Sequence, residues 1–384
     1  MTRYVAGMSQ SLSIFYLFAR FDPQGGDAWS RRALRLMAAF GEKARHTVAA
    51  DACVGGVPDG VRATLAQQPP PLTGAVSVAR YEAIARAMRG HDLVLSFGAG
   101  AIDAVMARRA FPRDAPPIVH HEDAEATTIG GAARLYRRIA LGAAAGLVVR
   151  SDEAAAPAAA RWKVGGERLH VIPDGVDLSA FARGPDAKTV AGFRRKPADV
   201  VIGVVADLSG DGANGGEDVA LLVRAVAGLS ARFRLVVVGD GPGRAAVEKA
   251  ALAMGVDDRL VLPGALPRSA AYLGGFDVLL LPLRPGPAPA VVVEAMAAGV
   301  PVMALRETAA AALLSAENGA ILSAHAAEVT LRDALQPLAT DATLRAAIGA
   351  ANRARAAQVH DAAAMIARSA AVYGAAAGRP GSLM

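Results

Sequence analysis

Short apolar, β-branched runs alternate with alanine-rich segments of helical length along most of the chain. The predicted strands are Ser13–Phe18, Thr47–Ala50, Leu93–Ser96, Pro117–His120, Gly146–Val149, Leu169–Ile172, Val200–Val205, Arg234–Val238, Leu260–Leu262, Val278–Leu281, Val300–Ala304 and Ala320–Leu322. The predicted helices between them include Ala28–Ala39, Val78–Met88, Ala133–Ala143, Val219–Leu229, Gly243–Met254 and Pro289–Ala298. Short buried strands that alternate with helices predict α/β domains in which parallel sheets are built from βαβ units.

The alternation stops once, where turn residues cluster between Pro173 and Pro185, and then starts again. A chain of 384 residues is long enough for two domains. We therefore predict two Rossmann-like, doubly wound domains, over residues 1–175 and 176–355, that face each other across a cleft. The remaining residues, 356–384, are predicted to form C-terminal helices with a loose tail.

Composition excludes several classes of protein. Cys53 is the only cysteine, so an internal disulfide framework and a cysteine-based zinc site are ruled out. The net charge of +6 comes from dispersed arginines rather than from one basic element with interleaved aromatic residues, which argues against a nucleic-acid partner. No apolar stretch is long enough to span a bilayer. We expect a cytoplasmic protein with a mildly basic surface, suited to anionic small molecules or to peripheral contact with the inner membrane.

Two features of the first half are candidates for chemistry. Gly25 and Gly26 follow the first predicted strand and precede a helix, where backbone N–H groups can approach an anion; the alternative is a tight turn. His120 and His121 come at the end of a predicted strand, where an imidazole can donate a hydrogen bond or act as a base. The alternative is a pair of capping or core-edge histidines. No third ligand at metal-binding spacing accompanies them, so we predict no metal site.

Two features of the second half are also candidates. Gly239-Asp240-Gly241-Pro242 follows a strand and can cradle a phosphate or a nucleoside, or simply make a βα turn. Glu294 interrupts an otherwise apolar helix. Because an unpaired buried carboxylate is costly, we expect Glu294 to face a polar cleft or a hydrogen-bonding ligand such as a ribose diol.

These features, taken in order, resemble the retaining, family-4-type glycosyltransferases of GT-B fold. The residues that carry the resemblance are Gly25-Gly26, His120/His121, Ile172-Pro173-Asp174-Gly175-Val176-Asp177, Gly239-Asp240-Gly241-Pro242, Phe276-Asp277-Val278, Glu294-Ala295-Met296-Ala297-Ala298-Gly299-Val300-Pro301 and Asn318-Gly319. The resemblance implies a nucleotide-sugar donor bound by the C-terminal domain and a glycan or lipid-linked acceptor presented by the N-terminal domain. It implies no metal and no cofactor, and helices after Ala356 that cross back to the first domain.

The resemblance also implies roles for single residues. Glu294 would bind the donor ribose, and Gly26, with Gly25, would approach the diphosphate or the acceptor. His121, or His120 in the alternative register, would contact the transferred sugar. Gly239, Gly241 and Asn318 would complete the donor site.

The chain departs from the family pattern at three donor-site positions. Asp207 stands where the family has an arginine, Gly215 where it has a lysine, and Gly286 where it has a glutamate. A charge-assisted contact to phosphate contributes about 1.5–3 kcal/mol, so these differences bear directly on catalysis. Two hypotheses follow: a glycosyltransferase of polysaccharide or glycoconjugate biosynthesis, or a catalytically degenerate partner or scaffold protein with the same fold.

Overall fold

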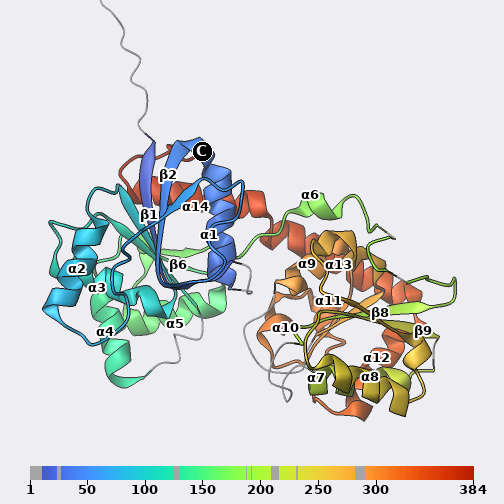
Figure 1. The fold of residues 1–384 in the computed structure, drawn as a ribbon. Helices are drawn as coiled ribbons and strands as arrows, with labels where there is room; N and C mark the ends of the chain where they lie inside the picture. The colour runs from blue at the N-terminus through green and yellow to red at the C-terminus, as the bar shows by residue number, and fades with distance from the viewer. Residues whose placement is uncertain are drawn as a thin grey trace, which may run out of the picture. The chain divides into compact units, whose positions relative to one another are not determined.

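The structure, a computed structural model, describes residues 11–23, 27–123, 130–186, 188–191, 193–208, 216–230, 232–281 and 290–384. The chain divides into two compact units (Figure 1). The first comprises residues 1–174 and 363–384, and the second comprises residues 175–362. The sequence had suggested a division after residue 175 and a C-terminal segment that starts at residue 356.

The first unit is built on a seven-stranded parallel sheet. Its strands are β1 (Leu12–Phe21), β2 (Ala44–Cys53), β3 (Ala63–Leu65), β4 (Leu93–Phe97), β5 (Ile118–Glu122), β6 (Gly146–Val149) and β7 (Leu169–Val171). Their order is β3-β2-β1-β4-β5-β6-β7, and every neighbouring pair is parallel. The order reverses between β1 and β4, and ligands of such sheets bind beyond the carboxyl ends of the strands near this switch point.

Helices cover both faces of this sheet. They are α1 (Ala28–Phe40), α2 (Val78–Met88), α3 (Ile102–Ala110), α4 (Gly131–Leu141), α5 (Asp152–Trp162) and α14 (Ala362–Ala376), with 3-10 turns η1 (Gly41–Lys43), η2 (Ala99–Ala101) and η4 (Gly166–Arg168). One core packs Tyr16 and Phe18 against Leu36 of α1 and Tyr373 of α14. A second core on the other face holds Phe15 with residues of α2, α3 and α5. The last long helix of the chain therefore completes the core of the first unit.

The second unit repeats this plan with five parallel strands. They are β8 (Val200–Val205), β9 (Phe233–Val238), β10 (Leu260–Gly264), β11 (Val278–Leu280) and β12 (Val302–Met303), in the order β10-β9-β8-β11-β12. The helices are α6 (Leu178–Phe181), α7 (Gly216–Ala227), α8 (Arg244–Ala253), α9 (Val291–Ala298), α10 (Ala309–Leu313), α11 (Ala316–Gly319), α12 (Glu328–Thr340) and α13 (Ala342–Val359), with 3-10 turns η5 (Asp257–Arg259), η6 (Ser269–Ala271) and η7 (Leu273–Gly275). Its order reverses between β8 and β11.

The predicted α/β fold with two Rossmann-like sheets is confirmed, and one predicted strand is wrong. Ala320–Leu322 is not a strand; only Ser323 makes an isolated bridge, to Leu305. The side-chain amide of Asn318 instead hydrogen-bonds to the backbone of β12. Its Oδ1 accepts from Val302 N at 2.9 Å, and its Nδ2 donates to Val302 O at 2.6 Å. Strand β3 was not predicted, because it is only three residues long.

The central strand of the second unit contains a glycine at which only a hydrogen fits. A Cβ built on Gly203 of β8 would lie 2.1 Å from Cδ2 of the Phe276 ring. Phe276 and the neighbouring strand residues belong to one buried core. The ring therefore packs directly onto the backbone of β8.

Gly203→Ala is expected to lower the free energy of unfolding of the second unit by about 1–3 kcal/mol, because the ring or the strand must move. Urea unfolding of the full chain measures the loss. Gly319→Ala is the matched control, since no heavy atom lies within 4 Å of its added Cβ. Equal urea midpoints for the two variants would contradict this packing.

Candidate active site

A cluster of charged side chains lies at the carboxyl edge of the sheet in the first unit. Asp123 follows β5, Arg150 follows β6 and Asp174 follows β7, so the three residues end three neighbouring strands. Trp29 and Arg32 reach the same place from α1, which Asp27 caps by accepting a hydrogen bond from Ser30 N at 2.8 Å. We call these five residues, Trp29, Arg32, Asp123, Arg150 and Asp174, the edge cluster.

Arg150 is the centre of the edge cluster. Its Nε donates to Asp123 Oδ1 at 2.7 Å, and its Nη1 donates to Asp174 Oδ2 at 3.0 Å. Trp29 Nε1 donates to Asp123 Oδ2 at 2.9 Å, and the Arg150 guanidinium stacks 4.8 Å from the centre of the Trp29 ring. Ion pairs and a cation–π contact thus fix both carboxylates in place.

Arg32 supports the edge cluster from inside the unit. Its side chain is only 1% exposed, and its Nη1 donates to Asp174 Oδ1 at 2.9 Å and to Ile172 O at 2.8 Å. The Nε and Nη2 atoms of Arg32 have no hydrogen-bond partner among the described residues. Asp174 is therefore the counter-ion of a buried positive charge.

The two carboxylates of the edge cluster differ in their electrostatics. Burial alone would raise the pKa of Asp174, but the charges of Arg32 and Arg150 hold this pKa below its usual value. Burial raises the pKa of Asp123, and Arg150 offsets part of this effect. Asp174 is thus the more firmly ionised of the two.

His120 and His121, the predicted sugar-contacting residues, lie inside β5 rather than at its end. The strand continues to Glu122, and both side chains are completely buried. Ser96 Oγ and His120 Nδ1 are 2.8 Å apart, and His120 Nε2 lies 3.4 Å from Glu122 Oε2. The two ring nitrogens are used in the opposite sense to a catalytic triad, in which the serine contacts Nε2 and the carboxylate contacts Nδ1. Because all three residues are also buried, the hydroxyl of Ser96 is closed to substrate.

His121 is engaged on both ring nitrogens. Its Nδ1 lies 3.2 Å from Ser96 O, and its Nε2 lies 2.7 Å from the hydroxyl of Tyr373 in α14. The ring stacks on Phe97 at 4.3 Å, and burial lowers its pKa well below the usual value, so the imidazole is neutral at neutral pH. A contact of either histidine with a sugar stays a prediction. Gly25 and Gly26 lie outside the described residues.

The carboxyl edge of the second sheet carries the predicted glycine loop. Gly239 and Gly241 have φ angles of 139° and 140°, which L residues rarely adopt. A Cβ on Gly239 would lie 1.8 Å from Ala206 O, so the loop packs on the end of β8. A Cβ on Gly216 would lie 2.6 Å from Gly243 O, which brings the beginnings of α7 and α8 together. The loop and two helix N-termini therefore share one edge.

Glu294 and Asn318 occupy different environments in the second unit. Glu294 lies in the first turn of α9 and is half-buried. The burial of Tyr272, together with the negative charge of Glu294, raises the pKa of Tyr272 to about 12. Asn318 is completely buried and, besides its bonds to Val302, accepts at Oδ1 from Asn352 Nδ2 at 2.7 Å. Its amide therefore holds β12 and α13 together, and its predicted part in donor binding stays a prediction.

Of the three positions expected to depart from the family pattern, the structure describes one. Asp207 follows β8 and is exposed, whereas Gly215 and Gly286 lie outside the described residues. Two exposed arginines follow other strands of the same sheet. Arg268 comes after β10 and has a left-handed backbone conformation, with φ 58°. Arg306 comes after β12 and donates to Leu322 O at 3.3 Å.

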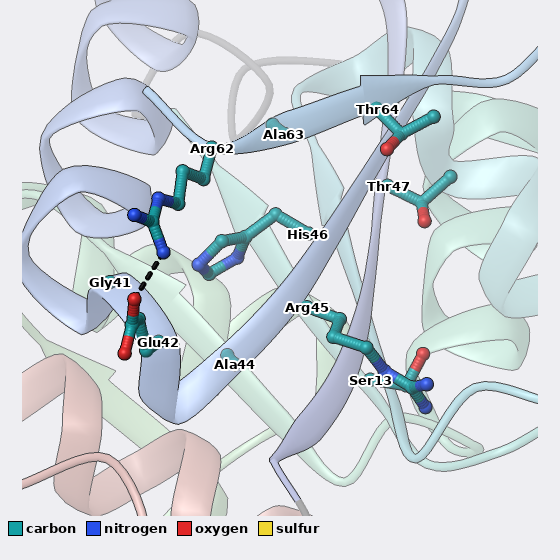
Figure 2. A pocket seen from close by; sticks show the side chains of 10 residues that line it. All are labelled: Ser13, Gly41, Glu42, Ala44, Arg45, His46, Thr47, Arg62, Ala63 and Thr64. Carbon is teal, nitrogen blue, oxygen red and sulfur yellow. Dashed lines mark hydrogen bonds and ion pairs between the residues drawn. The ribbon is translucent and has the colours of Figure 1, made fainter. Parts of the chain in front are cut away.

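A separate pocket of about 760 Å³ lies at the opposite, amino edge of the first sheet (Figure 2). Ser13, Ala44 and Ala63, near the starts of β1, β2 and β3, line it together with His46 and the ion pair of Arg62 with Glu42. The His46 ring is 4% exposed, and burial lowers its pKa to about 4. None of the candidate site residues predicted from the sequence lines this pocket.

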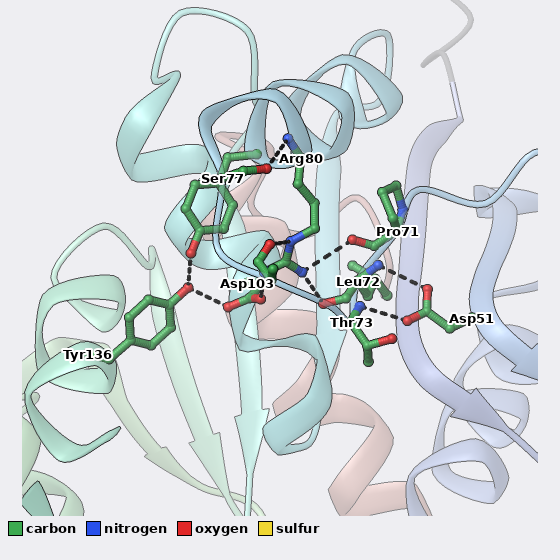
Figure 3. A network of polar contacts seen from close by, with 10 residues as sticks. Asp51, Pro71, Leu72, Thr73, Ser77, Arg80, Asp103 and Tyr136 are labelled. Carbon is green, nitrogen blue, oxygen red and sulfur yellow. Dashed lines mark hydrogen bonds and ion pairs between the residues drawn. The ribbon is translucent and has the colours of Figure 1, made fainter. Parts of the chain in front are cut away.

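A polar network ties together the helices on one face of the first unit (Figure 3). Asp103 of α3 accepts from Arg80 of α2, at 2.5 Å, and from the hydroxyl of Tyr136 of α4. Arg80 also donates to the carbonyls of Leu72 and Ala75. The network holds the segment before α2 in place, and we assign it a structural role.

Comparisons with known proteins agree with this fold. HepE from Anabaena, solved in complex with UDP, superposes with a TM-score of 0.71 at 17% identity and covers 94% of this chain and 98% of its own. The lipopolysaccharide glycosyltransferase WaaG gives a TM-score of 0.60 at 17% identity, over 94% of this chain and 99% of its own. The chain therefore has the GT-B fold.

Sequence similarity is more specific. Residues 202–341, which all lie in the second unit, match the family model for group 1 glycosyl transferases. The 2-deoxystreptamine glucosyltransferase of Streptomyces kanamyceticus is 33% identical over 173 residues. The matched segment is 44% of this chain and 44% of that relative, so the likeness spans less than half of either protein.

Asp174→Asn is expected to lower the free energy of unfolding of the first unit by about 2 kcal/mol at pH 7, because Arg32 loses its counter-ion. The pKa of Asp174 is lowered in the folded state. The difference from wild type is therefore present above the unfolded-state pKa of about 3.9 and vanishes as the pH falls through the folded-state pKa. Urea unfolding between pH 7 and pH 3 measures it.

The control for this variant is Asp114→Asn. Asp114 makes an exposed ion pair with Arg89 at 2.7 Å in the same unit. Such pairs contribute about 0–1 kcal/mol. A loss of stability in Asp174→Asn no larger than in this control, or one that persists unchanged at pH 3, would contradict the assigned role of Asp174.

Proposed function

We propose that the chain is a glycosyltransferase that moves a sugar from a nucleotide-sugar donor to a glycan or lipid-linked acceptor in polysaccharide or glycoconjugate biosynthesis. The observation that carries the proposal is the match of residues 202–341 to group 1 glycosyl transferases. HepE, which shares the fold, is described in complexes with UDP and with UDP-glucose. A UDP-sugar is therefore the first donor to test.

The second unit supplies the groups that the proposal needs for the donor. The N-termini of α7 and α8 begin beside the Gly239–Gly241 loop, and helix N-termini favour a diphosphate. The half-buried carboxylate of Glu294 would accept hydrogen bonds from both ribose hydroxyls. In place of the family's arginine and lysine, Arg268 and Arg306 would neutralise part of the leaving diphosphate. The proposal requires no metal and no cofactor.

A second candidate is a catalytically degenerate, glycosyltransferase-like partner or scaffold protein. The observation that favours it is Asp207, whose exposed carboxylate follows β8 and would repel a diphosphate. The two candidates differ in one property that can be measured directly, since only the enzyme must bind a nucleotide.

Titration calorimetry of the full chain with UDP and UDP-glucose is expected to show micromolar binding. Glu294→Ala is expected to weaken it about tenfold or more, because the ribose hydroxyls lose a charged acceptor. Glu328→Ala is the control, since Glu328 also lies in the first turn of a helix of this unit, α12, and its side chain is 41% exposed.

No binding of nucleoside diphosphates or nucleotide sugars at millimolar concentration would overturn the enzyme proposal and favour the scaffold. Micromolar binding that Glu294→Ala abolishes and Glu328→Ala preserves would exclude the scaffold. The calorimetric panel includes other nucleoside diphosphates, because the groups proposed for the donor address its diphosphate and its ribose rather than its base.

We further propose that the protein contacts the anionic cytoplasmic leaflet peripherally. Among the described residues, no helix is both long enough and apolar enough to cross a membrane. Helix α4 instead exposes Leu135 and Ile139 beside Arg134 and Arg138, an arrangement suited to lying on a membrane surface. In helix α13, by contrast, Arg353 and Arg355 donate to backbone carbonyls of their own unit.

Arg134→Glu with Arg138→Glu is expected to weaken sedimentation with vesicles of 30% phosphatidylglycerol by about tenfold or more, because each basic residue contributes about 1 kcal/mol at such a surface. Arg62→Glu with Arg86→Glu makes the same change of charge at exposed positions of the same unit. Equal losses in the two double variants would show a nonspecific effect of net charge and contradict the role of α4.

A further inference from the structure

We propose that the edge cluster of the first unit binds neutral hydroxyl groups of the acceptor, with Asp123 and Asp174 as acceptors and Arg150 as the group that fixes them. The proposal rests on the proposed function, because it takes the bound molecule to be the sugar acceptor. It assigns a ligand class to residues that the sequence motifs did not single out as a site.

The position of the edge cluster supports a binding role. Asp123, Arg150 and Asp174 each follow a strand of the same parallel sheet, and β5, β6 and β7 are neighbours in it. Ligands of open α/β sheets bind beyond the carboxyl ends of the strands. The edge cluster therefore lies at the edge where ligands of such sheets bind.

Three charged side chains of the edge cluster are partly open to solvent. The side chains of Asp123, Asp174 and Arg150 are 28%, 36% and 24% exposed. By contrast, the side chains of Arg32 and of the two histidines of β5 are at most 1% exposed. A ligand at this edge would therefore meet the carboxylates of Asp123 and Asp174, and not the histidines predicted from the sequence.

Charge decides the class of ligand. Asp123 and Asp174 carry two negative charges, and Arg32 and Arg150 carry two positive charges at distances of 2.5–3.0 Å. The edge cluster is thus formally neutral and offers little attraction for a phosphate or a free ammonium group. Ionised carboxylates accept hydrogen bonds only, and each has about four acceptor positions. The complementary ligand is a neutral polyol, such as the hydroxyl pair of a sugar ring.

The edge cluster is also held rigidly enough to select an orientation. Arg150 stacks on Trp29 and bridges both carboxylates, and Trp29 Nε1 holds the second oxygen of Asp123. Trp29 is only 6% exposed, so the indole supports the charged groups rather than stacking on a ligand itself. Fixed acceptors lower the cost of ordering the site when a sugar binds.

The variants that test this inference are Asp123→Asn and Arg150→Lys. Asp174 is less suitable, since its removal would leave Arg32 unpaired and destabilise the unit. Asp123→Asn keeps the shape of the side chain and removes its charge. Arg150→Lys keeps the charge but cannot bridge two carboxylates with a planar fork. Asp114→Asn is the matched control, because Asp114 is ion-paired and 34% exposed, close to the 28% of Asp123.

The experiment is saturation-transfer NMR on the full chain, with methyl α-glucoside as the neutral probe and glucose 6-phosphate as the charged one. We expect wild type and Asp114→Asn to bind methyl α-glucoside at millimolar concentration and to bind glucose 6-phosphate no more tightly. Asp123→Asn and Arg150→Lys should each weaken methyl α-glucoside binding about fivefold or more. The affinity for UDP, measured by calorimetry, should be the same in all four proteins.

Three results would overturn the inference: no binding of methyl α-glucoside to wild type at 100 mM, unchanged binding in both variants, or tighter binding of glucose 6-phosphate that depends on Asp123. If the wild-type protein does not bind UDP, the proposed function is overturned instead. Because the sugar and the nucleotide are read out separately, the two failures are distinguishable.

Discussion

The requirement that a parallel sheet be covered on both faces governs each unit. The strands β1 and β8 are apolar on both sides, and each sheet separates two buried cores. Such coverage forces every connection to cross over as a helix or a long loop, which returns each strand in the same direction. In each unit all carboxyl ends therefore meet at one edge of the sheet, and the candidate site residues of that unit lie at this edge.

Local pattern was sufficient to predict this framework. Gly146–Val149, Val200–Val205 and the helix Val78–Met88 were predicted to the residue, because burial on both faces leaves continuous apolar runs and an amphipathic helix leaves a period near 3.6. The prediction failed at Ala320–Leu322, where the run is equally apolar. There the side-chain amide of Asn318 takes the hydrogen bonds of Val302 at the edge of β12. A single side chain of this kind produces no periodic pattern in the sequence.

The candidate site was predicted less well, because its contacts join residues far apart in the chain. Arg32 and Asp174 are 142 positions apart, and His121 and Tyr373 are 252 apart. The sequence drew attention to His120 and His121 because they are conspicuous residues near a strand end. The strand extends two residues further, which buries both and leaves Asp123 at the edge. A charged residue after each of three strands was the available signal, and only the sheet order shows that those strands are neighbours.

The two edges use charge differently, and this bears on the two kinds of ligand that we propose for them. In the first unit, each exposed carboxylate of the edge cluster is paired with a guanidinium at 3.0 Å or less, so the edge cluster is polar but formally neutral. In the second unit, the polarity comes chiefly from helix N-termini and a glycine loop, with Asp207, Arg268 and Arg306 exposed around them. Backbone dipoles suit a phosphate, and fixed carboxylates suit hydroxyl groups. The net charge of +6 for the whole chain does not reveal this difference, because the local charge of a site depends on how its own side chains are paired.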